Sequence, residues 1–519
     1  MGNSQKSLFN TSSRTKNTVK SSLIGVISNV FNVCLGFVYR TIFLNILSAE
    51  YLGINGLFTN ILQVLSIAEL GITTVIVYRF YKPIKEGNIQ EVGKLMNFFK
   101  LIYRLIALII FIAGLMVVPF VQLFINNTKE IPQDVNLQLV YILFLFNTVV
   151  SYLFVYKQVL LSADQRNYIV SIIQSIALAI KYTAQIIILI LCKSYTLTLE
   201  IGIVSTLAIN YILSFWITQK YKPIFKVSEN ISVEERRIIL NDTKACMLHK
   251  IGATAKISTD NIILTKVISL VATGVYSNYS LIISSMQTII GQLLGNFVSS
   301  IGNAHVSLND EDNYNIYKKL LFIDLWISVV VTVNVYLLIN DFIQLWIGGA
   351  FILDDFSVII LCLQFYICIS RQINISYVNG CGLFVKDKIR PVVEAILNLV
   401  ISIVLAKYVG IVGVFLGTVL SSILTVCWRE PLVLFKYEFK KSVNEYWRNY
   451  LEFLFLGVII GVVLKNLKQM IRFEVTWVSW IGEAFIYTIV INLAILLVFH
   501  NKDEIRFLGA IIKRKLTYR

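Results

Sequence analysis

Five ionisable side chains lie inside long apolar stretches of the sequence, where a charge is costly. A charged residue near the centre of a membrane-spanning helix costs roughly 2.5–3.5 kcal/mol on insertion scales, so it usually faces a partner or a water-filled path. The cations are Arg40, Lys181 and Lys256, and the carboxylates are Glu69 and Asp260. Buried cations attract anions such as a diphosphate, which Arg binds in a bidentate way. The carboxylates could bind H⁺ or Na⁺ as a coupling ion, or neutralise the cations.

Uncharged polar residues share helical faces with these charges. They recur at steps of three and four residues, which places them on one side of a helix. A polar stripe on an otherwise apolar helix is typical of the wall of a hydrated cavity. The residues expected to line it are Asn29, Asn32, Gln63, Gln174, Gln185 and Asn278.

Each charge also has a structural interpretation. Lys256 and Asp260, four residues apart, could neutralise each other on one helix. Arg40 stands roughly 9 Å from the middle of its helix and could extend toward the membrane surface, or it could pair with Glu69. Lys181 has no charged residue within one helical turn in sequence, which favours it as a cavity-facing cation.

Three more charges, Arg371, Asp324 and Glu394, lie nearer the helix ends, where a structural role is favoured.

Motifs of catalysis and metal binding are absent from the sequence. There is no GxxxxGK[ST] or HExxH, and the histidines stand far apart at His249, His305 and His500. The seven cysteines occur singly, without the spacing of a zinc site or a disulfide framework. We therefore expect a protein that is not an enzyme and that has no metal or organic cofactor.

The composition predicts an all-α polytopic membrane protein. Hydrophobic residues make up 57% of the 519 residues and charged residues only 15%, which is more apolar surface than one soluble core would bury. About 14 segments could cross roughly 30 Å of hydrocarbon: residues 22–46, 55–80, 101–125, 137–161, 167–192, 196–218, 245–267, 271–299, 318–341, 354–378, 389–408, 410–434, 446–464 and 476–499.

The net charge of +16 reflects topology. Most of the 46 Lys and Arg residues lie in the two termini and in the connections on the same side, which is the bias of cytoplasmic segments. Both termini are therefore expected in the cytoplasm. The basic first 20 residues resemble a cytoplasmic arm, since no cleavage site for a signal peptide follows the first apolar run.

Glycine motifs indicate a duplication of six helices. Four expected helices open with LGINGLF, IGIVSTL, TGVYSNY and VGIVGVF, which contain Gly53, Gly202, Gly274 and Gly410. Matching positions predict two bundles of the same orientation, although small residues also serve simple helix packing. The expected domains are the arm (1–20), an N-terminal bundle (21–219), a linker (220–244), a C-terminal bundle (245–436), two added helices (437–500) and a basic tail (501–519).

The chain resembles the bacterial polysaccharide repeat-unit flippases, within the superfamily that includes the multidrug and toxin extrusion transporters. The resemblance rests on LGINGLF, on ELG around Glu69, on the following YKP, and on residues 259–279. It implies two six-helix bundles in a V around a central cavity. It also implies transport of undecaprenyl-diphosphate-linked oligosaccharides for O-antigen, capsule or exopolysaccharide, with cavity cations at the diphosphate.

The resemblance further implies a bacterial cytoplasmic membrane protein whose partners are membrane lipids, a polysaccharide polymerase and glycosyltransferases. No nucleic acid is expected. Fourteen helices also resemble the lipid II flippases, whose last two helices form a groove for the lipid tail. The alternatives are thus a lipid II flippase and a cation-coupled multidrug exporter that would use Glu69 and Asp260. A membrane-embedded glycosyltransferase or ligase is disfavoured because the expected outer loops are short.

Overall fold

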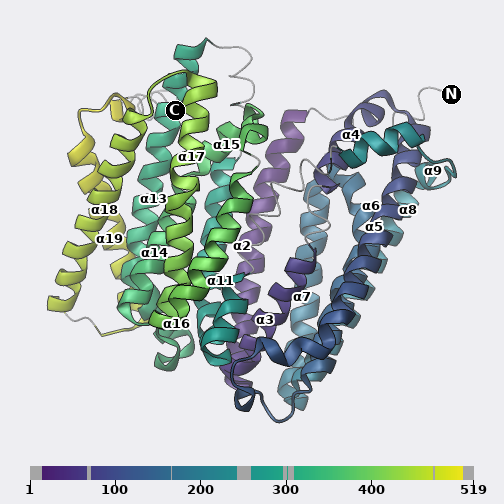
Figure 1. Ribbon diagram of the computed structural model, residues 1–519, viewed down its shortest axis with the longest axis horizontal. Helices are drawn as coiled ribbons and strands as arrows, with labels where there is room; N and C mark the ends of the chain where they lie inside the picture. The colour runs from purple at the N-terminus through teal and green to yellow at the C-terminus, as the bar shows by residue number, and fades with distance from the viewer. Residues whose placement is uncertain are drawn as a thin grey trace. The chain divides into compact units, whose positions relative to one another are not determined.

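A computed structural model describes most of the chain, namely residues 14–66, 72–164, 166–241, 243, 259–295, 301, 309–387, 389–471 and 474–506. Within these residues the regular structure is helical and no strand occurs (Figure 1). Ten helices of this part are long and apolar enough to cross a membrane. The predicted class, an all-α polytopic membrane protein, is confirmed.

The chain forms two compact units. Unit 1 comprises Met1–Ser277 and Pro391–Leu399, and unit 2 comprises Asn278–Arg390 and Val400–Arg519. These units do not coincide with the expected bundles, whose boundary was placed in residues 220–244. The two units are defined by contacts between residues, whereas the two expected bundles are defined by a duplication in the sequence. The units therefore do not test the two-bundle scheme, which stays a prediction.

Unit 1 is built from helices that pack side by side. In it, α7 contacts α2, α6 and α8, and α6 also contacts α5 (Figure 1). Its helices are α2 (Arg14–Ile46), α3 (Ala49–Leu65), α4 (Ile72–Glu86), α5 (Ile89–Val117), α6 (Leu137–Ala163), α7 (Asn167–Cys192), α8 (Tyr195–Lys220) and the first residues of α11 (Leu270–Gly295).

Side-chain caps set the start of several helices in unit 1. Asn88, Asn136 and Ser194 each accept a hydrogen bond from a backbone N–H in the first turn of α5, α6 and α8. Such a cap satisfies a donor that has no partner inside the helix. Because Asn136 and Ser194 directly precede largely apolar segments, the starts of α6 and α8 fall close to the predicted ones.

Unit 2 is organised around α13 (Asp310–Ile347), which contacts α14, α15, α18 and α19. The rings of Phe322 and Phe453 lie 5.2 Å apart, and those of Phe453 and Phe499 lie 4.4 Å apart, so aromatic packing joins α13, α18 and α19. The other helices are α14 (Asp355–Ile369), α15 (Gln372–Gly380), α17 (Val426–Leu434), α18 (Asn444–Ile471), α19 (Trp477–Phe499) and the part of α16 (Arg390–Leu424) that follows Leu399.

Several predicted helix boundaries need correction. The expected helix 101–125 begins earlier, at Ile89, because Asn88 caps α5. The expected helix 55–80 overlaps α3 and α4, and because residues 67–71 between them are outside the described part, its continuity stays a prediction. Most of the expected helix 245–267 is also outside it.

The boundary predicted between helices 389–408 and 410–434 marks a real turn inside α16. Gly410 has φ of +62°, a conformation that favours glycine, and Val409 beside it is also non-helical. After the turn the chain folds back closely against the preceding segment. A Cβ on Gly413 would lie only 2.3 Å from the carbonyl oxygen of Leu405. One glycine makes the turn and the next permits the close return.

Two of the four glycine motifs meet directly in unit 1. A Cβ on Gly53 of α3 would lie 2.3 Å from the carbonyl oxygen of Leu270, and a Cβ on Gly274 of α11 would lie 2.2 Å from that of Ala49. Each glycine therefore lies against the backbone of the first residue of the other helix. The contact between the two motifs is therefore reciprocal.

Candidate functional site

Lys181 lies near the middle of α7, which packs between α2 and α8. Its side chain is half-buried, and its Cε stands 3.3 Å from the point where a Cβ on Gly202 of α8 would be. Within the described part of the chain its ammonium group makes no hydrogen bond or ion pair. A desolvated cation without a counter-ion offers its charge to an anionic ligand.

An aromatic pair joins α2 to α7 beside the two predicted cations of unit 1. The rings of Tyr39 and Tyr182 are stacked, with centroids 4.5 Å apart and an interplanar angle of 4°. These tyrosines are the sequence neighbours of Arg40 and Lys181, and Arg40 interacts electrostatically with both rings' hydroxyl groups. The stack therefore fixes the two helices at the level of both cations.

The guanidinium of Arg40 points to the start of α11. Its Nη2 donates a hydrogen bond to Oγ of Ser277, and that hydroxyl in turn donates to the carbonyl oxygen of Gly274 at 2.7 Å. Arg40 is thus oriented in part by a neutral hydroxyl group.

Gln185, one turn after Lys181, lies against the same glycine, Gly202. Its Nε2 donates to the carbonyl oxygen of Thr198 at 2.9 Å, and a Cβ on Gly202 would lie 2.5 Å from that nitrogen. Its Oε1 is buried and has no hydrogen-bond partner among the described residues. Gly202, the glycine of the IGIVSTL motif, therefore makes room for two polar side chains of α7.

The remaining predicted polar residues of unit 1 have varied surroundings. Asn29 and Asn32 are half-buried on α2, and Oδ1 of Asn32 is buried without a partner in the described part. Gln63 is exposed on α3. Gln174 is also exposed, and its Nε2 donates to Oε1 of Gln158 on α6 at 3.0 Å.

Four predicted residues remain, and the structure describes two of them. Glu69 and Lys256 lie outside the described residues, so their predicted roles stay predictions. Asp260 is 4% exposed in unit 1, next to Thr259, whose hydroxyl donates to Oδ1 of Asn398 at 3.1 Å. Asn278 is fully buried and belongs to unit 2.

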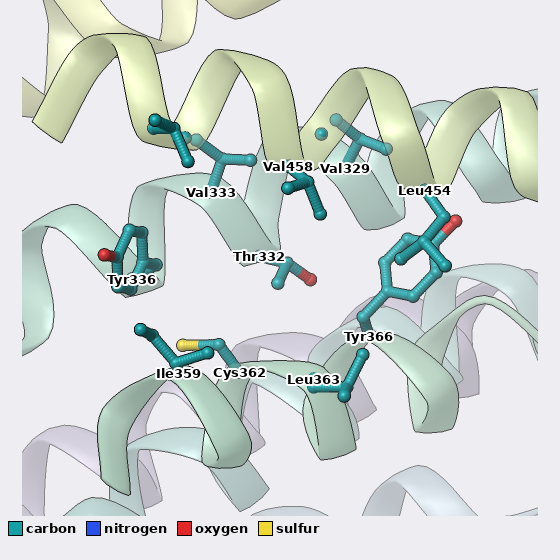
Figure 2. A pocket seen from close by; sticks show the side chains of 13 residues that line it. Val329, Thr332, Val333, Tyr336, Ile359, Cys362, Leu363, Tyr366, Leu454 and Val458 are labelled. Atoms are coloured by element: carbon teal, nitrogen blue, oxygen red, sulfur yellow. The ribbon is translucent and has the colours of Figure 1, made fainter. Parts of the chain in front are cut away.

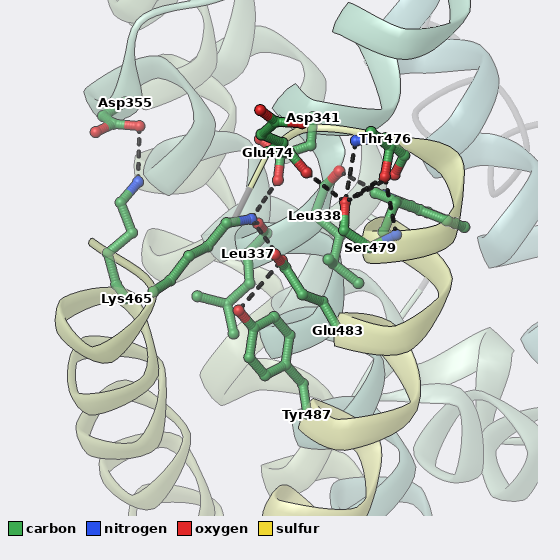
Figure 3. A network of polar contacts seen from close by, with 12 residues as sticks. Leu337, Leu338, Asp341, Asp355, Lys465, Glu474, Thr476, Ser479, Glu483 and Tyr487 are labelled. Atoms are coloured by element: carbon green, nitrogen blue, oxygen red, sulfur yellow. Dashed lines mark hydrogen bonds and ion pairs between the residues drawn. The ribbon is translucent and has the colours of Figure 1, made fainter. Parts of the chain in front are cut away.

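A partly buried ion network in unit 2 connects the two added helices to α13. Lys468 of α18 pairs with Asp341 of α13 and, at 3.0 Å, with Glu483 of α19 (Figure 3). The hydroxyl of Tyr487 donates to Glu483 at 3.2 Å. Lys465, one turn before Lys468, pairs with the more exposed Asp355 at 2.9 Å. The helices that the sequence suggested as a peripheral addition are thus anchored in unit 2.

An apolar groove of about 360 Å³ lies between α13, α14 and α18 (Figure 2). Glycines of α18 widen it: a Cβ on Gly457 would stand 3.3 Å from Val329, and one on Gly461 would stand 3.8 Å from Tyr336. Thr332 and Tyr366 bring hydroxyl groups to an otherwise apolar lining. The groove suits a hydrocarbon chain.

Sequence reasoning missed the tyrosine stack and the Lys468 network. Both join side chains from helices far apart in the sequence, and no periodicity within one helix reveals such a contact. The signal available for the stack was weak: Tyr39 and Tyr182 each stand next to a cation that the sequence singled out.

No protein-family model matches the chain, and no curated protein matches it. Solved structures do. The structure of the lipid II flippase MurJ in an inward closed conformation aligns at a TM-score of 0.64 and 14% identity, covering 92% of this chain and 99% of that one. An inward-facing multidrug resistance MATE family transporter of the MOP superfamily aligns at 0.59 and 13%, covering 79% and 98%.

A MOP superfamily transporter from Pyrococcus furiosus aligns at a TM-score of 0.53 and 13% identity, covering 82% of this chain and 97% of that one. The chain has the fold of MOP superfamily transporters. At such identities the likeness concerns the fold alone. The predicted superfamily fold is thus confirmed, and the narrower polysaccharide repeat-unit family stays a prediction.

Proposed function

We propose that the protein is a flippase for undecaprenyl-diphosphate-linked oligosaccharide repeat units. It moves them from the inner to the outer leaflet of the bacterial cytoplasmic membrane by alternating access, for assembly of a surface polysaccharide. The observation that carries the proposal is Lys181, a half-buried cation on a spanning helix with no hydrogen bond or ion pair to the described residues. A diphosphate supplies the missing negative charge.

The surroundings of Lys181 favour an anionic head group over a cationic drug. Arg40 adds a second positive charge on the adjacent α2, oriented by the hydroxyl of Ser277. Desolvated cations repel a positively charged drug and attract a phosphate. Amide side chains such as Gln185, whose Oε1 has no partner in the described part, offer hydrogen bonds to sugar hydroxyl groups.

The lipid part of the cargo would stay in the bilayer. The apolar groove between α13, α14 and α18 provides a surface for a prenyl chain (Figure 2). Several groove residues of α18, among them Val458 and Val462, are more than half exposed, so a hydrocarbon chain could enter sideways from the membrane. In this scheme α18 has a role in cargo binding.

A lipid II flippase is the second candidate. It is favoured by α18 and α19, which are anchored to α13, and by the alignment with MurJ over 92% of this chain. Both candidates transport a polyprenyl diphosphate, and they differ in the sugar. Complementation separates them, because only a lipid II flippase would support growth of cells that lack their own.

Deletion of the gene tests the proposal. We expect lipid-linked repeat units to accumulate on the inner leaflet, with surface polysaccharide lost and drug sensitivity unchanged. Repeat units that are exposed normally on the outside would contradict the proposal. Sensitivity to cationic drugs with normal polysaccharide would indicate instead an exporter that uses Glu69 and Asp260.

A further inference from the structure

Asp324 is a fully buried carboxylate in the N-terminal half of a spanning helix of unit 2, α13. The backbone N–H of Ile373 donates to its Oδ2 at 3.0 Å, and the N–H of Gln372 also interacts with the carboxylate. These two residues open α15, and the residue at the N-cap, Arg371, provides no side-chain cap. Asp324 therefore caps α15 from a different helix, 49 residues away in the sequence.

The other carboxylate oxygen, Oδ1, is buried and has no hydrogen-bond partner among the described residues. The same is true of the hydroxyl of Ser328, one turn along α13, and of the hydroxyl of Tyr366 on α14. A protonated carboxyl group and an ionised one differ at such an oxygen, because only the protonated group can donate. The surroundings of Oδ1 are therefore compatible with either protonation state of Asp324.

The charged groups around Asp324 do not neutralise it. Within the described part, the titratable groups that interact with it are Tyr317 on α13, Tyr366 on α14 and Tyr450 on α18, and none is a cation. Arg371 is the nearest cation in sequence to the capped helix.

That arginine is engaged elsewhere. Its Nε donates to Oε2 of Glu430 on α17 at 2.9 Å, and its Nη2 pairs with the other oxygen of the same carboxylate. A bidentate pair of this kind is strong and directional, so it holds Arg371 toward α17.

Two opposing effects act on the charge of Asp324. Burial without a cation disfavours the ionised form, whereas the N–H groups at the start of α15 favour it. When the carboxylate is protonated, its hydrogen bonds from the backbone lose their charge-assisted character and weaken.

The capped helix adjoins a break in the chain path. α14 ends at Ile369 and α15 begins at Gln372, and Asp324 holds the N–H groups on the far side of that break. We propose that Asp324 is the proton-binding residue that couples transport to the proton gradient. Uptake of one H⁺ converts the carboxylate to a carboxylic acid, weakens the cap on α15 and changes the angle between α14 and α15.

This inference rests on the proposed transport function and gives the coupling role to a residue other than Glu69 or Asp260. Tyr366 links it to the cargo, because its side chain lines the apolar groove and also interacts with Asp324 (Figure 2). A hydrocarbon chain in the groove and a proton on Asp324 therefore act on the same tyrosine.

The test compares Asp324→Asn with wild type in proteoliposomes that contain a polyprenyl-diphosphate-linked oligosaccharide, with and without an imposed pH gradient. Asn keeps an oxygen that accepts from the α15 backbone but does not titrate. We expect the gradient to raise the wild-type rate several-fold and to leave the variant's rate unchanged. The control is Asp354→Asn, since Asp354 caps α14 through Ser357 in an exposed position and should respond as wild type does.

Equal stimulation of wild type and Asp324→Asn would overturn the inference, as would a wild type that transports without responding to the gradient; in both cases the flippase function stands. A wild type that transports nothing in either condition would count against the proposed function itself. Should Asp324→Asn not fold, Asp324→Glu and Asp324→Gln make the same comparison with a longer side chain. Stimulation of both variants, or of neither, would contradict the inference.

Discussion

At the scale of single residues, the account depends on cations that are kept in apolar surroundings. Lys181 has Gly202 beside its stem and lacks a counter-ion among the described residues, and Arg40 is oriented by a serine. Such a site is costly in the empty protein. The cost is understandable if an anionic ligand binds there during each cycle.

Removing the charge of Lys181 should impair transport. Lys181→Met keeps the length of the side chain and loses the ammonium group, whereas Lys181→Arg keeps the charge. Losing a hydrogen bond to a charged group costs about 1.5–3 kcal/mol, so we expect transport at low substrate to fall roughly 10- to 100-fold in Lys181→Met. The measurement is the rate of polysaccharide export at equal membrane abundance.

Lys181→Arg serves as the control and should retain most of the wild-type rate. Unimpaired export by Lys181→Met would remove Lys181 from the cargo site.

The sequence revealed Lys181 because its isolation is visible within one helix. It could not reveal the role of Asp324, because the backbone N–H groups that donate to this carboxylate belong to residues 372 and 373, far away in the sequence. The sequence places Asp324 near the end of the expected helix 318–341, which favours a structural role. Contacts between distant segments decide such cases, and periodicity does not report them.

At the scale of elements, glycines decide how closely helices approach. The four motifs were read from the sequence as marks of a duplication. In the structure their local roles differ. Gly53 and Gly274 allow α3 and α11 to pack closely, Gly202 leaves space for side chains of α7, and Gly410 forms a turn. The sequence predicted α7 well, since residues 167–192 form one long and largely apolar segment. The sequence placed the starts of α5 and α13 too late, because the first turns of these helices are polar and lack the apolar pattern by which spanning segments were predicted.

Gly53→Ala should destabilise the packing of α3 against the start of α11. The new methyl group would lie 2.3 Å from a backbone oxygen that cannot rotate away, and overpacking of this kind costs about 1–3 kcal/mol. We expect a lower melting temperature in detergent. Gly36→Ala on α2, where no atom lies within 4 Å, should be neutral or slightly stabilising. Equal melting temperatures for both variants would refute the close contact.

Lys468→Met should loosen α18 and α19 from α13. It leaves Glu483, whose side chain is 8% exposed, without its cation, and an unpaired buried charge costs at least about 1–3 kcal/mol. Lys465→Met is the matched control, since its partner Asp355 is 63% exposed and such pairs contribute about 0–1 kcal/mol. Limited proteolysis at residues 474–476, which precede α19, should be faster in Lys468→Met only. Similar cleavage of the two variants would contradict the anchoring role.

At the scale of the whole molecule, the two units carry different parts of the proposed activity. Unit 1 contains the cations and amides suited to a diphosphate sugar, and unit 2 contains the apolar groove and the buried carboxylate. The fold shared with MOP superfamily transporters is compatible with such a division. A lipid-linked substrate has the same two parts, one polar and one apolar.

Reconstitution tests the central claim most directly. Purified protein is placed in liposomes with a polyprenyl-diphosphate-linked oligosaccharide on the inner leaflet, and a membrane-impermeant glycosidase reports the sugar that reaches the outside. We predict time-dependent exposure with the wild-type protein and a much slower rate with Lys181→Met. Exposure no faster than in liposomes without protein, while a cationic drug is transported, would contradict the account.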